Sequence, residues 1–188
     1  MTRTAKAVTL TRMTQSAENY VPVAKMRSQA YRSWMIALSV VGIWLLLIVI
    51  PPILAANGNT ALSSPVYRFF SFICHQMPDR SFHLMEHQLA VCSRCFGVYF
   101  GLLLGLVIYP LWRKIENIDP LPRIWLFASM VPIAVDWSLG VFGIWENNHF
   151  SRFITGLILG VGCATYIMPA LIEIVRNLSV GRSTRLER

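Results

Sequence analysis

The chain of 188 residues is 55% hydrophobic and only 14% charged, with a mean hydropathy of +0.52 and a formal net charge of +8. This composition excludes an ordinary soluble domain and is typical of a membrane protein. The basic residues are scattered beside apolar segments and do not cluster with aromatic side chains, so the charge indicates contact with anionic lipid and predicts no nucleic-acid partner.

Residues 1–33 are polar and are expected to form a cytoplasmic arm. After the arm, four segments are apolar over about 20 residues, the length needed to cross a hydrocarbon core of ~30 Å. We therefore predict an all-α membrane protein, a four-transmembrane-helix bundle over residues 34–175, followed by a cytoplasmic basic tail at 176–188. The predicted spans cover residues 34–55, 96–112, 124–145 and 153–175, and a Cys/His loop, 56–95, separates the first two.

The end of the first span carries two signals for a change of direction. Pro51-Pro52 should kink or end the helix, because proline lacks a backbone N–H and clashes with the preceding turn. Asn57-Gly58-Asn59 is then expected to form a turn. Residues 65–72 are amphipathic and should lie at the membrane interface.

The distribution of basic residues predicts the orientation of the bundle. Thirteen of the 17 Lys and Arg flank one side, in the arm, the connection at 113–123 and the tail. Because Lys and Arg are enriched in cytoplasmic segments, both termini of this multi-pass protein should be cytoplasmic and its location should be the cytoplasmic (inner) membrane. The Cys/His loop is then extracytoplasmic.

The loop between the first two spans contains three of the four cysteines and three of the four histidines. Cys92 and Cys95 have the Cys-x-x-Cys spacing from which one tetrahedral ion can be held, and Cys74-His75 supplies two further donors if the loop folds back. We therefore predict a zinc-type divalent metal ion bound by Cys74, His75, Cys92 and Cys95.

Two alternatives to the metal remain open from the residues. An oxidising extracytoplasmic compartment favours a disulfide, which would leave one of the three loop cysteines unpaired. The thiols could also be inert. Cys163 lies in the middle of the fourth span between Gly162 and Ala164 and is expected to be a packing residue.

His83 to His87 spell His-x-x-Glu-His, the pattern of one group of zinc proteases, on what we expect to be a helical turn. Those enzymes need a large soluble domain and a distant third ligand. We therefore interpret the pattern as a surface helix that matches by chance, with His87 left as an alternate ligand.

Small residues recur every four positions on two of the predicted spans. Gly97, Gly101 and Gly105 do so on the second span, and Gly156, Gly160 and Ala164 on the fourth. Such stripes let helix backbones approach closely. We predict that the second span packs against the fourth, and a homodimer seam is the alternative; the sequence does not fix an oligomeric state.

Asp136 lies inside the third span, where a carboxylate usually faces a cavity or a partner. We predict a catalytic role for Asp136 and for Arg152, which directly precedes the fourth span. The alternatives are a structural hydrogen bond for Asp136 and an Asp136–Arg152 salt bridge for Arg152. The predicted topology places these residues on the same half of the bundle as the cysteines. The predicted substrate-binding residues are Tyr99, Asn147, Asn148 and Arg152.

The segments from Cys74 to Phe82, from Val91 to Gly101 and from Asn147 to Gly156 resemble a bacterial and archaeal family of small predicted membrane proteins of unknown function. Its Cys-His-Gln and Cys-x-Arg-Cys-x-Gly-x-Tyr motifs are specific in combination, and the resemblance covers about residues 65–165. It implies that these residues form one site. The family tends to have Gly in place of Glu86, Pro in place of Ala90, and Asp-Gly in place of Asp136-Trp137.

The functional prediction is an integral membrane protein with a zinc-type site at its extracytoplasmic face, working as a metalloenzyme on the headgroup of a lipid or other amphiphile. In that reading Asp136 is the base for metal-bound water. One alternative is a quinone-linked thiol oxidoreductase. Such an enzyme needs a second cysteine pair, whereas the loop has only Cys74 in addition to the Cys92/Cys95 pair. Another is a non-catalytic assembly factor or metal carrier that docks another membrane protein.

Overall fold

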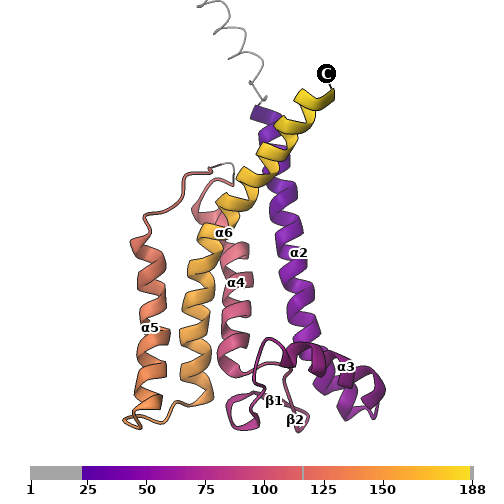
Figure 1. Cartoon of the computed structure of the whole chain (residues 1–188), viewed down its shortest axis with the longest axis vertical. Helices are drawn as coiled ribbons and strands as arrows, with labels where there is room; N and C mark the ends of the chain where they lie inside the picture. Colours follow the sequence, from indigo (N-terminus) through magenta and orange to yellow (C-terminus); the bar gives the residue numbers. More distant parts are fainter. Residues whose placement is uncertain (1–22, 116, 187–188) are drawn as a thin grey trace, which may run out of the picture.

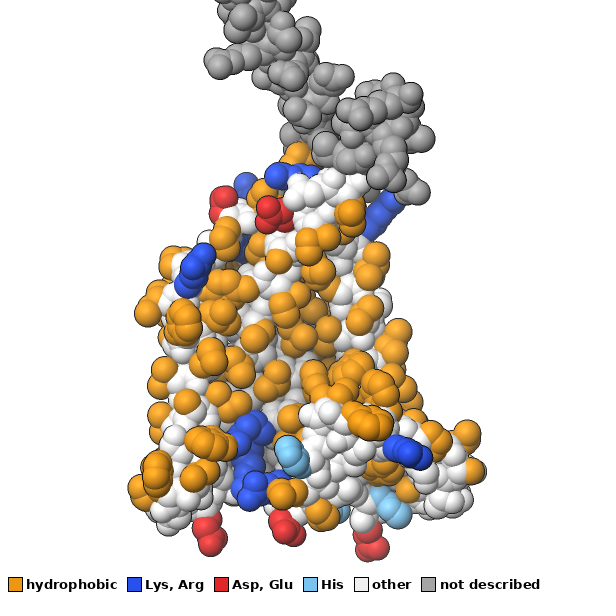
Figure 2. Space-filling model, viewed as in Figure 1, with side chains coloured by type: hydrophobic (Ala, Val, Ile, Leu, Met, Phe, Trp, Pro, Cys, Tyr) orange, Lys and Arg blue, Asp and Glu red, His pale blue; other side chains and the backbone are white. Residues whose placement is uncertain are grey.

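The computed structural model describes residues 23–115 and 117–186. Within them, four helices are long and apolar enough to cross a membrane, which confirms the all-α fold with four candidate spans (Figure 1). Hydrophobic side chains cover the middle of the visible face (Figure 2). The four helices are α2 (Val23–Ala56), α4 (Ser93–Trp112), α5 (Ile124–Val141) and α6 (His149–Leu186).

The two ends of the bundle differ in what they carry. The start of α2, the end of α6 and the connection between α4 and α5 lie at one end, and the segment 57–92 and the connection 142–148 lie at the other (Figure 1). Much of the expected arm, residues 1–22, lies outside the described residues. Residues 23–33 belong to α2, and 176–186, which we expected to be a tail, continue α6.

The first helix does not end at Pro51-Pro52 but continues to Ala56. Because Pro52 has no N–H, the carbonyl of Ile48 loses its helical partner, and the N–H of Ala90 in the loop donates to it at 3.3 Å. The proline pair therefore creates a docking point for the loop without breaking the helix.

The predicted turn at Asn57-Gly58-Asn59 is confirmed and ends α2. Gly58 has a φ of +78°, and its N–H donates to Ala55 O at 3.0 Å while that of Asn59 donates to Leu54 O at 2.9 Å. This is a Schellman motif, which requires the left-handed conformation that glycine adopts without strain.

The packing of α4 against α6 is the most extensive helix contact, and it confirms the prediction from the small-residue stripes. A Cβ on Gly101 would overlap the backbone oxygen of Leu157, and a Cβ on Gly105 would lie only 2.6 Å from that of Ala164. The two backbones therefore touch where the glycines alternate.

Helix α2 is joined to α4 by a similar use of proline. Pro110 leaves the carbonyl of Leu106 without its helical donor, and the indole N–H of Trp34 donates to that carbonyl at 2.8 Å. Leu106 and Tyr109 are buried there in a cluster with Met168 of α6.

Helix α5 lies at the side of the bundle and packs on α6. Gly162 of α6 allows the approach, because a Cβ there would lie 2.5 Å from Ser129 Oγ. At the far end of the bundle, Tyr166 donates to Pro122 O at 2.7 Å. At the loop end of the bundle, α5 lines a cavity with Trp137, Gly140 and Val141.

The segment 57–92 folds over one end of the bundle as a short helix α3 (Thr60–Ser71), a 3-10 turn η1 (Pro78–Arg80) and a hairpin of β1 (His83–Leu84) and β2 (His87–Gln88). The helical turn predicted for His83–His87 is wrong. Met85 and Glu86 have φ values of +51° and +64°, the signs expected for the two central residues of a type I′ hairpin turn. Helix α3 is amphipathic, as predicted for 65–72; Phe70 is buried, and Phe72, at the residue that follows the helix, is exposed.

Candidate metal centre and cationic cavity

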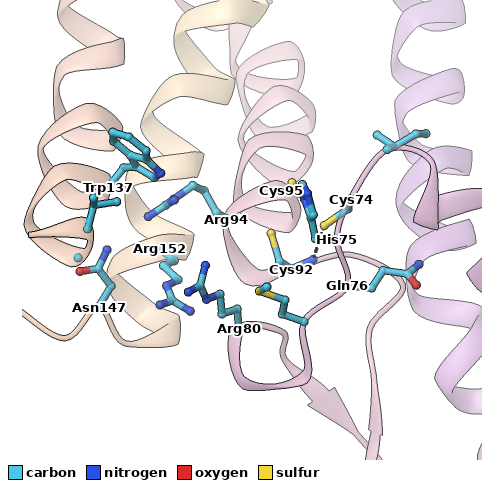
Figure 3. Close-up of a pocket in the computed structure, with 14 residues that line it drawn as sticks. Cys74, His75, Gln76, Arg80, Cys92, Arg94, Cys95, Trp137, Asn147 and Arg152 are labelled. Carbon is cyan, nitrogen blue, oxygen red and sulfur yellow. Dashed lines mark hydrogen bonds between the residues drawn. The ribbon is translucent and has the colours of Figure 1, made fainter. Parts of the chain in front are cut away.

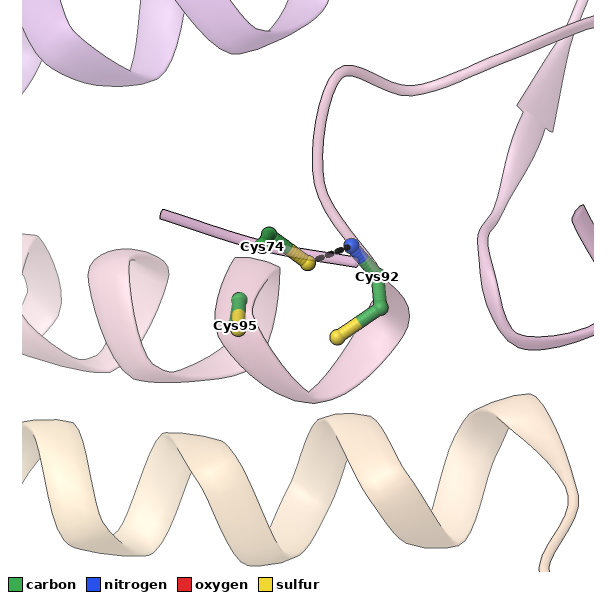
Figure 4. Close-up of side chains that lie close together, drawn as sticks. All are labelled: Cys74, Cys92 and Cys95. Atoms are coloured by element: carbon green, nitrogen blue, oxygen red, sulfur yellow. Dashed lines mark hydrogen bonds between the residues drawn. The ribbon is translucent and has the colours of Figure 1, made fainter. Parts of the chain in front are cut away.

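Three cysteines from two separate segments converge beside the first turn of α4 (Figure 4). Cys74 follows α3, Cys92 is the N-cap of α4, and Cys95 lies in its first turn. Their sulfur atoms all lie within 4.8 Å of one another. The loop thus folds back as the spacing of the cysteines predicts.

Hydrogen bonds from the loop hold Cys74 against α4. The amide of Gln76 donates to Tyr67 O at 2.7 Å and to Ala90 O at 2.8 Å, which ties the turn after Cys74 to both neighbouring segments. The backbone N–H of Cys92 donates to Cys74 Sγ at 3.2 Å. Gln76 has a φ of +47°, so this turn is held in an unusual conformation by its surroundings.

The electrostatic surroundings favour a thiolate at Cys74. Hydrogen bonds from the Cys92 and Cys95 side chains hold the pKa of Cys74 well below its usual range, in spite of the opposing effect of burial. The N-terminus of α4, whose N–H groups carry partial positive charge, acts in the same direction. Thiolate is the form of cysteine that binds a metal.

The fourth predicted ligand, His75, is not part of the sulfur cluster. Its side chain is exposed and lines a cavity of about 510 Å³ that also opens to all three cysteines. Cys163 lies in α6 apart from the group, and all four cysteines are free thiols.

The cavity lies between the cysteine cluster and the loop end of α5 (Figure 3). One wall carries Cys92, Cys95 and His75, and the opposite wall carries Trp137, Gly140 and Asn147. Gly140 allows Asn147 to pack closely, because a Cβ there would lie 3.0–3.2 Å from the Asn147 amide group. Three arginines also line the cavity: Arg80, Arg94 and Arg152.

Asp136 is buried and forms a salt bridge with Arg94, not with Arg152. Asn147 donates to the backbone oxygen of Asp136 at 2.5 Å. Arg94 therefore links the cysteine motif on α4 to α5, and Asn147 links the connection before α6 to the same turn. These contacts agree with the alternative in which Asp136 is held by structural interactions.

Two predicted substrate-binding residues have other contacts. Asn148 accepts the N–H of Ser151 at 2.7 Å, so its side chain caps the first turn of α6. The Tyr99 ring packs edge-on against Trp44, with ring centroids 5.8 Å apart. Neither residue lines the cavity, whereas Arg152 and Asn147 do.

The sequence assigned no individual role to Gln76, Arg80 or Arg94, although all three lie in the segments that carry the family resemblance. Gln76 and Arg94 lie inside the two cysteine motifs, and this position could have marked them as members of the site. Arg80 lies in the Cys74–Phe82 segment, but its approach to Arg152 depends on the path of the loop through η1. A further contact, Ser93 Oγ to His149 Nδ1 at 3.0 Å, joins the starts of α4 and α6.

Comparison with known proteins identifies two archaeal relatives, each described as an uncharacterised protein. The chain is 40% identical over 139 residues to a protein of Methanocaldococcus jannaschii, covering 71% of this chain and 88% of the relative. It is 35% identical over 97 residues to a protein of Methanothermobacter thermautotrophicus, covering 50% of this chain and 84% of the relative. No solved structure matches.

A family model described as "Predicted membrane protein (DUF2085)" matches residues 74–166. The matched region begins at Cys74 and includes the sulfur cluster, Asp136 and Arg152. The site therefore falls within the part of the chain that the family model describes. Together with the identity to the archaeal relatives, this match shows that the chain belongs to the DUF2085 family of predicted membrane proteins.

Proposed function

We propose that this protein is an integral membrane metalloprotein in which Cys74, Cys92 and Cys95 bind one zinc-type ion. The observation that carries the proposal is the convergence of three sulfur atoms, within 4.8 Å of one another, from two segments. Four ligands placed tetrahedrally at about 2.3 Å from zinc stand about 3.8 Å apart, so only a small inward movement would be needed.

Metal analysis of the purified protein tests this assignment. We expect about one zinc-type ion per chain and three thiols that react with a labelling reagent only after denaturation. Cys92→Ser should lose the ion, whereas Cys163→Ser, at the cysteine outside the cluster, should keep it. A metal-free protein with one disulfide among the three loop cysteines would contradict the proposal and favour the thiol oxidoreductase.

His75 is the proposed fourth ligand, because it follows Cys74 directly and lines the same cavity. If His75 binds, the site is closed and mainly structural; if it does not, one position is open to water or substrate. Cobalt substitution distinguishes these cases through the absorption spectrum. We expect His75→Ala to change the spectrum of the cobalt protein and His87→Ala, in the hairpin, to leave it unchanged.

We further propose that the cavity beside the cysteines receives the headgroup of a membrane amphiphile. A zinc-type ion bound there supplies a Lewis acid and a water of lowered pKa. Arg152 and Asn147 line the cavity and would hold the headgroup. The salt bridge to Arg94 supports a positioning role for Asp136 more than the predicted role of base.

The proposed location is the cytoplasmic membrane, with the cavity on the extracytoplasmic side. Support comes from the basic residues, of which thirteen of 17 lie in the arm, the connection 113–123 and the segment after residue 175. The described parts of these segments lie at the end of the bundle opposite the cavity.

A further inference from the structure

Three guanidinium groups from three different elements face the cavity between α5 and the cysteines (Figure 3). Arg80 comes from η1, Arg94 from the first turn of α4 and Arg152 from the first turn of α6. Arg152 lies close enough to both of the others for their charges to act on it. Figure 2 shows basic side chains gathered in this part of the surface, among hydrophobic ones.

The charges in the cavity are not balanced. Asp136 neutralises Arg94, but among the residues that the structure describes no carboxylate lies within 4.0 Å of Arg80 or Arg152. Like charges on one side of a partly apolar cavity repel each other. A negatively charged ligand would relieve the repulsion between the two guanidinium groups, which Asp136 and Cys92 offset only in part at Arg152.

A phosphate monoester has the charge and the shape that this pair requires. It carries about −1.5 to −2 charges at pH 7 and three acceptor oxygens, and guanidinium groups bind phosphate through paired hydrogen bonds. The cavity volume of about 510 Å³ is large enough for such a group together with part of the molecule that carries it.

The remaining lining indicates that the ligand also has an apolar part. Ile73 and Met77 lie on the loop side of the cavity, and Trp137 and Val141 lie on α5, all of them exposed side chains. The candidate span of α5 ends at Val141. A cavity at the end of a membrane span would lie where a lipid headgroup passes into its hydrocarbon chain.

We propose that the cavity binds the phosphate monoester of an amphiphile, with Arg80 and Arg152 as the phosphate ligands and the apolar wall against its chain. This inference deepens the proposed function, on which it rests, by naming the class of headgroup. Arg94 is a positioning residue here, because its charge is already paired with Asp136.

Binding to the detergent-solubilised, metal-loaded protein tests the inference, with isothermal titration calorimetry as the measurement. The probes are dihexanoyl phosphatidic acid, dihexanoyl phosphatidylcholine and inorganic phosphate. We expect the phosphatidic acid to bind at least about tenfold more tightly than the other two, since only it offers both a dianion and apolar chains. Equal affinity for phosphatidylcholine would overturn the charge assignment, and equal affinity for inorganic phosphate would overturn the amphiphile assignment.

Variants assign the binding to the two arginines. Arg80→Gln and Arg152→Gln should each weaken phosphatidic acid binding about tenfold or more, and Arg68→Gln, on α3 outside the cavity, should not. If Arg152→Gln fails to fold, Arg80→Gln, at an exposed position, still tests the site. Unchanged binding in the folded variants would overturn the inference.

The metal content of each sample keeps this test separate from the metal proposal. Metal-loaded protein that does not bind phosphatidic acid contradicts the anion site alone. Wild-type protein that is purified without a metal ion, yet binds phosphatidic acid through Arg80 and Arg152, contradicts the metal assignment and supports the anion site.

Discussion

At the scale of single residues, the Arg94–Asp136 pair decides how α5 is held at the loop end of the bundle. Asp136 is only 8% exposed, and its position within a candidate span makes an uncompensated charge costly. The pair joins two helices that the sequence separates by more than 40 residues.

We expect Arg94→Met to destabilise the protein by about 3 kcal/mol or more, because it leaves a buried carboxylate without its partner. The double variant Arg94→Met, Asp136→Leu should recover most of that loss, since both charges are removed. Thermal unfolding in detergent measures the difference, and Arg68→Met serves as the control at an exposed arginine. A double variant no more stable than Arg94→Met would show that the pairing does not hold α5.

The sequence predicted Asp136 as a special residue but not its partner. A lone carboxylate in an apolar segment is visible from the residues alone. Its partner depends on where α4 begins and how α4 rotates against α6, and close glycine contacts set that rotation. Arg152 and Arg94 were therefore both consistent with the sequence, and only packing distinguishes them.

At the scale of elements, the hairpin between β1 and β2 shows where local pattern misleads. His83 and His87 have helical spacing, and Met85-Glu86 lacks the Asn-Gly signal of a type I′ turn. Tertiary hydrogen bonds favour the hairpin instead: Tyr67 of α3 donates to Gln88 O at 2.6 Å, and the Ala90 N–H, just after the hairpin, donates to Ile48 O of α2 at 3.3 Å.

Glu86→Gly should stabilise the protein by about 1 kcal/mol, because glycine accepts the φ of +64° without the strain that a Cβ imposes there. The gain should appear as a higher unfolding temperature. Glu86→Ala removes the same charge but keeps the Cβ, so it should give no such gain. Equal effects of the two substitutions would point to the charge and not to the backbone.

The stripe of small residues on α4 allows a matched test of helix packing. We expect Gly101→Ala to destabilise the protein by about 1–3 kcal/mol, since its Cβ would overlap the Leu157 backbone. Gly42→Ala, in α2, meets nothing within 4 Å and should be neutral or slightly stabilising, because alanine favours helix. Unfolding in detergent compares the two, and similar effects would contradict the contact between α4 and α6.

At the scale of the whole molecule, the sequence predicted the four spans because each span depends only on the hydropathy of its own segment of about 20 residues. It also predicted which two spans share a close contact, because the small residues mark both faces. It did not predict the lateral position of α5 or the cavity beside it, since these follow from the shapes of three packed elements at once.

The same arrangement makes the orientation of the bundle testable. Segments rich in Lys and Arg should stay in the cytoplasm, so a green fluorescent protein fused after Arg188 or after Asp119 should fluoresce. Alkaline phosphatase fused after Gly58 should be active, because it folds only outside the cytoplasm. The control fusions exchange the reporters: green fluorescent protein after Gly58 should be dark, and alkaline phosphatase after Asp119 or Arg188 should be inactive. Active phosphatase at Asp119 together with a dark fusion at Arg188 would place the cysteine cluster and the arginine-lined cavity on the cytoplasmic side, where their ligand would have to come from the inner leaflet.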